Sequence, residues 1–498
     1  MKKTLFLALL TVLLAACTVQ VPKEFTVVPD TPDIYPDYAE VTVPVNIAPL
    51  NFMYTDTTAT AAVTVLTAAD GQTMAVKGLK ADWNVKQWHA LLGASAGKEV
   101  TVSSYLRTAD GWKQYHDFSI RVSRDSIDPY ISYRLIAPSY VTYEDLTINQ
   151  RCLEDWDEDV IFRNLLISTD QNGQCINCHN YRHYRTSTMQ FHARQHQGGT
   201  ILVVDGEPRK INLKTDSTLS AGVYPSFHPT HHYIAYSVNN TGQSFHTFDN
   251  EKIEVQDISS DLILYDYDQN EVTVIENDTT EWECYPNWSA DGRYLYYVSA
   301  HYEIQDYEYR ERDIIDHYQD FHYDLYRKAF DPDTKHFGPK ERVFAASEIG
   351  KSVTLPRVSP DGRYLMFTIG DYGVFQIWHR SADLMLMDLE DGSVRNMREI
   401  NSPCAESFHN WSSSGRWVLF SSRREDSNFT RLYITHVDSR GHGTKPFVLP
   451  QRDPEFYHDF FRSYNIPEFM VEPVTITPHE FADVIHGETV QAQYHEQY

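Results

Sequence analysis

The fold is decided by a stretch that recurs along the chain, Tyr285-Pro286-Asn287-Trp288-Ser289-Ala290-Asp291-Gly292-Arg293-Tyr294-Leu295-Tyr296-Tyr297-Val298. Its Asp-Gly pair at 291–292 supplies the residues that a tight turn between strands needs. The aromatic and apolar residues on both sides of the turn suit a pleated strand. The stretch therefore predicts a strand that enters a tight turn and returns as a second strand.

Three further copies of this pattern give the chain an internal repeat. They share all or part of a kernel, aromatic-Ser-x-Asp-Gly-Arg-aromatic, and lie at 224–229, 355–367 and 409–420. Intervals of roughly fifty to seventy residues fit propeller blades that carry inserts. We therefore predict a β-propeller of about six blades over residues 185–450, in which residues 189–204 form a degenerate blade.

The part of the chain before the repeats also reads as β-structure. Residues 38–125 alternate between apolar and polar side chains, and Asp-Gly turn signals at 70–71 and 110–111 separate the alternating runs. One segment, Asp82 to Leu92, has helical spacing and a plausible N-cap in Asp82. We expect a β-sandwich-like domain over 38–125, so the fold class predicted for the whole chain is all-β.

The N-terminus predicts export from the cytoplasm. Met1-Lys2-Lys3 precedes a short apolar run, which ends in Leu14-Ala15-Ala16-Cys17. Small residues directly before a cysteine resemble the lipobox of bacterial lipoproteins; an ordinary signal peptide with an incidental cysteine is the alternative. The resemblance implies a signal over residues 1–17, an acylated Cys17 and a proline-rich tether over 18–37. We expect a lipid-anchored protein of the cell envelope, at the outer membrane and facing the periplasm.

The charge balance restricts the class of partner. The chain has 69 Asp and Glu against 43 Lys and Arg, for a formal net charge of -26. Such a surface argues against nucleic acid and anionic lipid headgroups as partners. It is compatible with a protein partner in the envelope, including a basic redox partner.

A cysteine motif carries the chemistry of the sequence. Cys175-Ile176-Asn177-Cys178-His179 is a C-x-x-C-H run, which is the attachment signature of c-type haem. The two thiols can add to the vinyl groups of one porphyrin, and the adjacent histidine can bind the iron. We predict one covalent haem c on Cys175 and Cys178, with His179 as axial metal ligand, on a connector that spans 126–184.

The iron's second ligand and the rival interpretations of the motif stay open. Met189 is the first candidate for the distal position and His192 the second; an open position would permit ligand binding. The alternatives to haem are a thioredoxin-like redox pair, a zinc site completed by nearby histidines, and a plain disulfide. No catalytic acid–base constellation is found. Three further cysteines remain after Cys17 and the motif, and they are Cys152, Cys284 and Cys404. Because three is an odd number, at least one thiol of an exported protein is unpaired. A disulfide between Cys284 and Cys404 stays possible.

The order of these features resembles a known family. The repeat kernel is similar to the PD40 (WD40-like) repeat of TolB-type propellers, and the whole chain resembles the TolB-like, haem-motif lipoproteins of Bacteroidetes-type bacteria. The stretches that carry this resemblance are 133–138, 175–179, 191–194, 198–200, 260–262, 445–447 and 467–469. The partner-binding N-terminal domain of TolB itself is not visible here, so TolB's function is not carried over.

The export signal, the haem motif and the propeller together lead to two hypotheses, which belong to different functional classes. The first is a membrane-anchored periplasmic haem protein that transfers electrons or senses redox state. The alternative is a non-enzymatic scaffold or protein-binding propeller of the cell envelope in which the haem is structural. Residues 451–498 are expected to form a C-terminal extension of the propeller.

Overall fold

The computed structural model describes residues 19–137, 145–167, 174–247 and 251–496, and these divide into two compact units. Unit 1 comprises the chain up to Ser126 together with Pro450–Phe460, and unit 2 comprises Ile127–Leu449 and Phe461–Tyr498. The predicted signal peptide and Cys17 lie outside the described residues. Among the described residues, no helix has the length and the apolar character that a membrane crossing requires.

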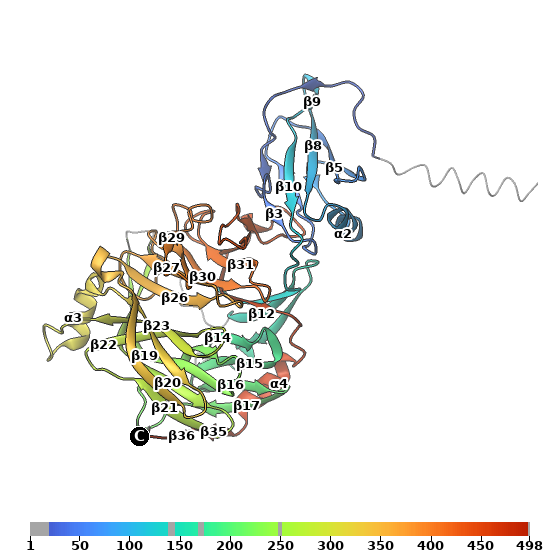
Figure 1. Cartoon of the computed structure of the whole chain (residues 1–498). Coiled ribbons are helices and arrows are strands. Elements are labelled where there is room, and N and C mark those ends of the chain that lie inside the picture. Colours follow the sequence, from blue (N-terminus) through green and yellow to red (C-terminus); the bar gives the residue numbers. More distant parts are fainter. Residues whose placement is uncertain (1–18, 138–144, 168–173, 248–250, 497–498) are drawn as a thin grey trace, which may run out of the picture. The chain divides into compact units, whose positions relative to one another are not determined.

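The described residues of unit 1 form two sheets, as the alternation predicts, and the α-helix α2 (Figure 1). The strands of its larger sheet are β1 (Thr26–Val27), β3 (Thr42–Val43), β5 (Ala61–Thr67), β6 (Thr73–Lys77), β8 (Glu99–Thr108), β9 (Gly111–Gln114) and β10 (Phe118–Val122). The smaller sheet has β2 (Ile34–Tyr35), β4 (Phe52–Tyr54) and β7 (Lys80–Ala81). Phe52 of the smaller sheet meets Phe118 of the larger one edge to face, with ring centroids 6.2 Å apart. The unit is therefore sandwich-like.

The helix of unit 1 begins later than its sequence suggests. Helix α2 spans Val85–Ala94, and its N-cap is Asn84, whose side-chain oxygen accepts the backbone N–H of Gln87 at 3.1 Å. Asp82 instead accepts a hydrogen bond from the amide of Asn51. The predicted N-cap was therefore wrong by two residues, because both side chains have the chemistry of a cap.

Unit 2 is a β-propeller of six sheets among the described residues, which we number as blades in chain order. Blade 1 contains β11 (Tyr130–Ile136), β12 (Thr147–Cys152), β13 (Glu158–Arg163) and the distant β34 (Ser463–Met470). Blade 2 contains β14 (Gln174–Arg182), β15 (Arg185–Gln195), β16 (Gly199–Val204) and β17 (Glu207–Asn212). Blade 3 contains β18 (Val223–Phe227), β19 (Tyr233–Phe245), β20 (Ile253–Asp266) and β21 (Glu271–Glu276).

The remaining blades follow the same pattern of four antiparallel strands. Blade 4 contains β22 (Glu281–Trp288), β23 (Tyr294–His301), β24 (Asp324–Asp331) and β25 (His336–Phe344), with α3 (Arg310–Asp316) in its long insert. Blade 5 contains β26 (Ser352–Val358), β27 (Tyr364–Gly370), β28 (Asp383–Asp388) and β29 (Val394–Asn396). Blade 6 contains β30 (Glu406–Trp411), β31 (Trp417–Ser422), β32 (Arg431–His436) and β33 (Phe447–Val448).

The propeller closes through its C-terminal strand. Each inner strand contacts the next, from β14 through β18, β22, β26 and β30 to β34, and β34 contacts β14 again. Strand β34 completes blade 1 by pairing antiparallel with β11, so the first and last parts of the ring share one sheet. All its residues are buried. This ring confirms the predicted propeller.

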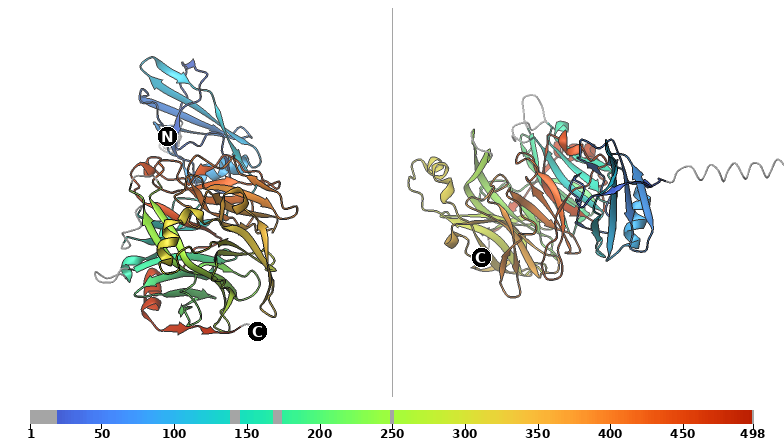
Figure 2. Two further views of the ribbon diagram at one scale, coloured as in Figure 1. Left: turned by 90° about the vertical axis from the view of Figure 1, so that its left-hand side faces the viewer. Right: turned by 90° about the horizontal axis from the view of Figure 1, so that it is seen from above.

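The predicted domain boundaries need correction, because the ring is larger than the repeat kernel indicates. The predicted connector, residues 126–184, contributes the three outer strands of blade 1 and the inner strand of blade 2. The predicted C-terminal extension, residues 451–498, is divided: its first part joins unit 1, and β34 enters the ring. Beyond β34, α4 (Pro478–His486) packs on the outer strands of blades 1 and 2. Strands β35 (Thr489–Gln491) and β36 (Gln493–Tyr494) then extend blades 2 and 3 (Figures 1 and 2).

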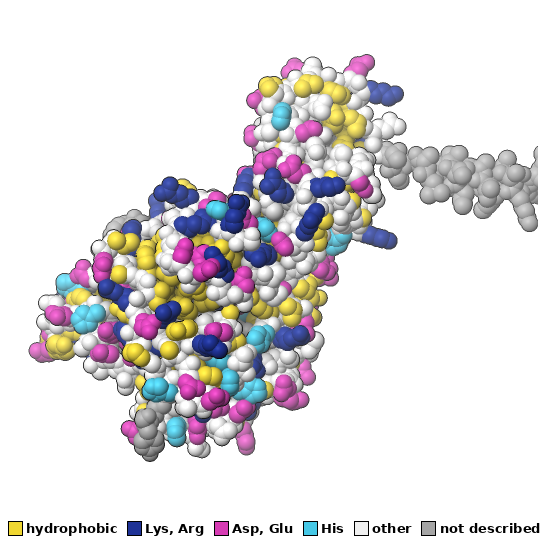
Figure 3. Space-filling view, in the orientation of Figure 1, with side chains coloured by type: hydrophobic (Ala, Val, Ile, Leu, Met, Phe, Trp, Pro, Cys, Tyr) yellow, Lys and Arg dark blue, Asp and Glu magenta, His cyan; other side chains and the backbone are white. Residues whose placement is uncertain are grey.

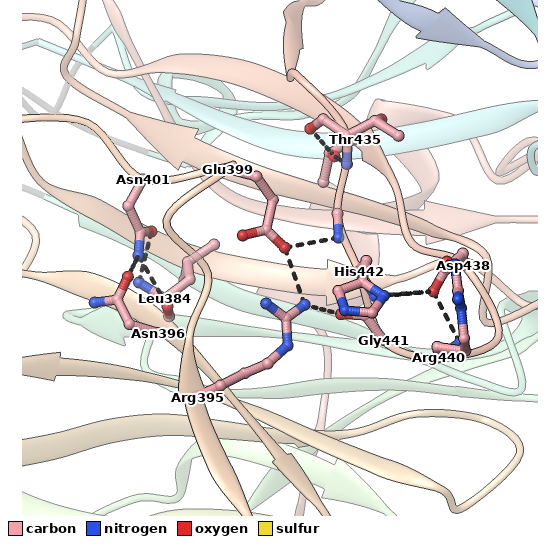
Figure 4. A network of polar contacts seen from close by, with 12 residues as sticks. Leu384, Arg395, Asn396, Glu399, Asn401, Thr435, Asp438, Arg440, Gly441 and His442 are labelled. Atoms are coloured by element: carbon pink, nitrogen blue, oxygen red, sulfur yellow. Dashed lines mark hydrogen bonds and ion pairs between the residues drawn. The ribbon is translucent and has the colours of Figure 1, made fainter.

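Polar contacts also join neighbouring blades away from the axis. In Figure 4, the guanidinium of Arg395 in blade 5 donates hydrogen bonds to the carboxylate of Glu399 and to the carbonyl of Gly441. Gly441 lies in the loop between β32 and β33 of blade 6. The carboxylate of Glu399 also accepts the backbone N–H of Gly443 at 2.9 Å. Figure 3 shows acidic, basic and histidine side chains interspersed over the viewed face.

Candidate functional site

A ring of six side chains surrounds the axis of the propeller. Each inner strand carries a β-bulge at which one residue has a positive φ between 45° and 55°. An extra residue at a bulge redirects a side chain out of the ordinary alternation. The six residues line one narrow channel of about 30 Å³, and they are Cys178, Tyr224, Tyr285, Leu355, Phe408 and Ile466. The second cysteine of the C-x-x-C-H motif is therefore the blade 2 member of a repeated ring.

The residue after each bulge also follows a pattern. It is proline in four blades and histidine in two, namely His179 and His409. His409 is buried, and its Nε2 lies 3.0 Å from the carbonyl of Met366 in the second strand of blade 5. His179 is equally buried and lies near the carbonyl of Ser132, the corresponding residue in the second strand of blade 1. The histidine of the motif thus has a counterpart in a blade without cysteines.

The imidazole of His179 is held neutral by its surroundings. Burial lowers its pKa to about 3, and the nearby guanidinium of Arg134 acts in the same direction. Neither ring nitrogen makes a hydrogen bond of ordinary geometry among the described residues. Burial likewise raises the pKa of the Cys178 thiol, although Arg194 and Arg134 oppose the shift. Both groups are therefore uncharged at neutral pH.

Cys175 opens on a different cavity. It lies three residues before Cys178 on β14, opposite Arg194 of β15, and it lines a groove of about 850 Å³. Cys178 and His179 line the narrow channel and not this groove. The three residues of the motif therefore do not face a common space.

The two predicted distal ligands lie on opposite faces of β15. Met189 is fully buried in an apolar cluster that also contains Phe162 and Phe191, and it lines neither the channel nor the groove. His192 lines the groove, and burial lowers its pKa to about 3. The structure therefore brings neither Met189 nor His192 into the channel where His179 lies.

As arranged, these residues do not fit a haem. A space of about 30 Å³ holds roughly one or two water molecules, far less than a porphyrin. Attachment through both thiols with His179 as the ligand would require β14 to leave its place in blade 2. The five described cysteines, including Cys284 and Cys404, are unpaired. No cluster of three or more metal-binding side chains occurs in the part of the chain that the structure describes.

The channel ends in a polar belt on the side away from the groove. Glu468 of β34 is buried and accepts hydrogen bonds from Asn180 of blade 2, at 3.2 Å, and from Asn410 of blade 6. Arg357 of blade 5 lies 3.4 Å from the same carboxylate. Burial raises the pKa of Glu468, although Arg357 opposes the shift. These contacts tie blades 1, 2, 5 and 6 together at the axis.

The groove lies where the inner strands begin. It runs from Tyr224 at the axis to Thr489 and Gln491 of β35, at the outer edge of blade 2. Its cationic and histidine lining residues are Arg134, His192, Arg194, His196, Lys210 and Lys214. None of the described residues that line it is Asp or Glu. The groove is therefore basic in a chain that is strongly acidic overall.

A long hairpin forms one wall of the groove. Strands β19 and β20 extend well beyond the other strands of blade 3, and the extension contributes Thr241, Gln243 and Val255 to the lining. The carboxylate of Glu254 lies 2.8 Å from Nε2 of His379, which belongs to the loop between β27 and β28 of blade 5. This buried contact fixes the hairpin across the end of the propeller.

The groove was not predicted from the sequence. Its cations lie at positions 134, 194, 210 and 214, on β11, β15, β17 and directly after β17, so no single short motif contains them. One signal was available for the channel: Cys178-His179-Asn180 aligns with Tyr285-Pro286-Asn287 and Phe408-His409-Asn410. That alignment identifies the cysteine motif as part of a blade.

Comparisons with known proteins give fold likenesses only. No family model and no curated protein matches the chain. Among solved structures, TolB from Acinetobacter baumannii has 12% identity over 78% of this chain and 85% of that chain, with a TM-score of 0.43. The periplasmic gluconolactonase of Pseudomonas aeruginosa has 13% identity over 64% and 95%, with a TM-score of 0.30. Because these scores are low, the propeller assignment rests on the strand pairing described above.

Proposed function

We propose that this chain is a lipid-anchored, non-enzymatic binding propeller of the cell envelope, and that its ligand occupies the groove at the start of the inner strands. The groove is the observation that supports this function. Ligand sites are typically concave spaces of about 300–1,000 Å³ with a few converging polar groups. At about 850 Å³, the groove has this size. The narrow channel behind it is far smaller.

Occupation of the groove can be measured through a native thiol. Cys175 lines the groove, whereas the partly buried Cys404 lies in the chain between blades 5 and 6. We expect iodoacetamide to label Cys175 less in intact cells than in the purified protein, with Cys404 labelled equally in both. Site-resolved mass spectrometry gives the two values. Equal labelling of Cys175 in both samples would contradict a ligand in the groove.

The anchor is tested separately from the groove. Because Leu14-Ala15-Ala16-Cys17 resembles a lipobox, Cys17→Ser should release the protein from membranes into the soluble fraction. Fractionation of the envelope followed by immunoblotting measures the change. Equal membrane retention of the variant and the parent protein would refute the anchor and leave the groove proposal standing.

A second candidate function is carried by the motif itself: a periplasmic haem c protein that transfers electrons or senses redox state. The unpartnered ring nitrogens of His179 favour it, whereas the separation of Cys175 from the channel opposes it. Haem attachment therefore stays a prediction of the sequence. Protein made with haem-maturation machinery should then show haem on a denaturing gel, and Cys175→Ser with Cys178→Ser should abolish the stain. An unstained parent protein would remove this candidate.

A further inference from the structure

We propose that the groove binds an elongated, hydroxyl-rich organic anion of the acidic-oligosaccharide type. This inference rests on the proposed function, because it names the ligand class of the same groove. Three observations carry it: the basic lining, the presence of two buried cations without an ionic partner, and the neutral polar groups that continue from the axis to the rim.

The first observation concerns charge. The groove has four lysine and arginine residues and no described carboxylate in its lining, although the chain has 69 acidic residues against 43 basic ones. A wall formed at random from this chain would contain more carboxylates than cations. A concave basic surface surrounded by an acidic protein attracts anions and concentrates them.

The second observation concerns Arg134 and Lys210. Arg134 is 5% exposed and Lys210 is 6% exposed, and neither forms an ion pair with another described residue. Their hydrogen bonds go to neutral oxygens: Arg134 to Ile176 and Asn465, and Lys210 to Ile485. The Nε of Arg134 has no partner within the described structure. A buried charge without a counter-ion is costly, so both positions are suited to an anion that enters the groove.

The third observation concerns the neutral part of the lining. Amide side chains are frequent there. Those of Asn212, Asn239 and Gln491 already donate hydrogen bonds within the protein, and the others are Asn177, Gln195 and Gln243. An amide both donates and accepts hydrogen bonds, as paired sugar hydroxyls do. The rings of Tyr224 and Phe375 add apolar surface. Cations combined with amides and hydroxyls fit a carboxylated saccharide better than a purely apolar acid.

The shape of the groove favours an extended ligand over a single ion. Its lining begins at the inner strands β14 and β18 and ends at β17 and the edge strand β35. Gly199 contributes to this shape, because a Cβ there would meet the Lys210 side chain at 3.0 Å. The absence of a side chain at Gly199 lets the lysine lie along the groove.

A matched pair of probes tests the ligand class with the full-length protein in detergent. Calorimetry compares a cello-oligosaccharide with its C6-oxidised, uronate-containing counterpart of equal length. We expect only the oxidised probe to bind, and Lys214→Glu to weaken it at least about fivefold, since a reversed rim charge opposes an anion. Lys210→Gln should also weaken binding. The control Arg398→Glu makes the same charge change at an exposed position outside the groove and should bind as the parent does.

The other outcomes are equally decisive. Equal binding of both probes would overturn the anionic class and keep the groove as a binding site. Binding that Lys214→Glu and Arg398→Glu weaken alike would show a general charge effect and overturn the inference. If neither probe binds while Cys175 is protected in cells, the saccharide class is wrong and the proposed function survives. If neither probe binds and Cys175 is not protected in cells, both the saccharide class and the proposed binding function are wrong.

Discussion

Cys178 and His179 stand at two positions that recur in all six blades, and this recurrence gives each residue a structural reason to be there. Larger side chains stand at this position in the other five blades and fill most of the axis, and cysteine is a small apolar side chain that fits the space they leave. The following residue has no ladder partner, which is why proline is accepted there in four blades. A histidine at this position can in addition reach the carbonyl of the preceding blade, as His409 does.

The equivalence of His179 with the four prolines leads to a first prediction. His179→Pro should fold and change the free energy of unfolding by no more than about 1 kcal/mol, because β14 has no ladder hydrogen bond to lose there. His192→Pro is the control. His192 pairs with both Asn177 and Thr200, so a proline there should lower the free energy of unfolding by about 3 kcal/mol or more. Urea unfolding measures both. A misfolded His179→Pro variant would contradict the equivalence.

The pair of Glu254 and His379 leads to a second prediction, on pH. Burial opposes protonation of His379, yet Glu254, helped by Glu251 and Asp371, raises its pKa above the ordinary 6.5. Because this pKa is raised, protonated His379 stabilises the folded hairpin below pH 6.5. That stability is lost as the pH rises through the pKa of His379 in the folded protein. Hydrogen exchange of β19 and β20, corrected for intrinsic rates, should therefore show weaker protection at alkaline pH. Glu254→Gln should remove this pH dependence, and an unchanged dependence would refute the role of the pair.

At the scale of elements, the sequence was informative wherever a blade contains the Asp-Gly turn. Blades 4 and 5 have this turn between their first two strands, and blade 6 has a close variant of it, Ser-Gly. Blade 2 differs: Arg182 pairs with Arg185, and the two residues between them, His183 and Tyr184, both have positive φ. Such a two-residue turn lacks the kernel's signature, so the inner strand of blade 2 was assigned to a connector.

Strand β34 was not predicted, for a different reason. Its sequence, Ser463-Tyr464-Asn465-Ile466-Pro467-Glu468-Phe469-Met470, lies after the last kernel and pairs with β11, more than 300 residues earlier. A single sequence contains no signal for pairing over that distance. The same holds for the groove, whose buried cations Arg134 and Lys210 come from different blades.

The joint between blades 5 and 6 leads to a third prediction. Burial opposes ionisation of Glu399, yet Arg395 and the N–H of Gly443 lower its pKa. Its contribution is therefore present above the ordinary pKa of 4.5 and lost as the pH falls through the lower folded value. Glu399→Gln should cost about 1 kcal/mol at pH 7 and nearly nothing in acid. Glu390→Gln, at a more exposed pair within blade 5, is the control for urea unfolding. An equal loss at both pH values would contradict the ionic role.

At the scale of the whole molecule, closure is the decisive feature, and it leads to a fourth prediction. A chain that ends at Phe460 lacks β34, so blade 1 would present β11 as an unpaired edge at the axis. We expect unit 2 of this variant to unfold at clearly lower urea concentration and with reduced cooperativity. A chain that ends at Gly487 keeps β34 and loses only β35 and β36, so it should unfold close to the parent. Tryptophan fluorescence follows the transition. A closed, fully cooperative ring without β34 would refute the role of this strand.

Closure of the ring by β34 also determines when the two units can be completed during biogenesis. Unit 1 requires residues 450–460 and blade 1 requires residues 463–470, so neither unit is complete until nearly the whole chain is available to fold. Until then, β14 lacks its neighbour β34, and Cys178 is not enclosed on that side. Once β34 is in place, Cys178 is 2% exposed and enclosed by six blades. Any enzyme that modifies this cysteine therefore has to act before the ring closes.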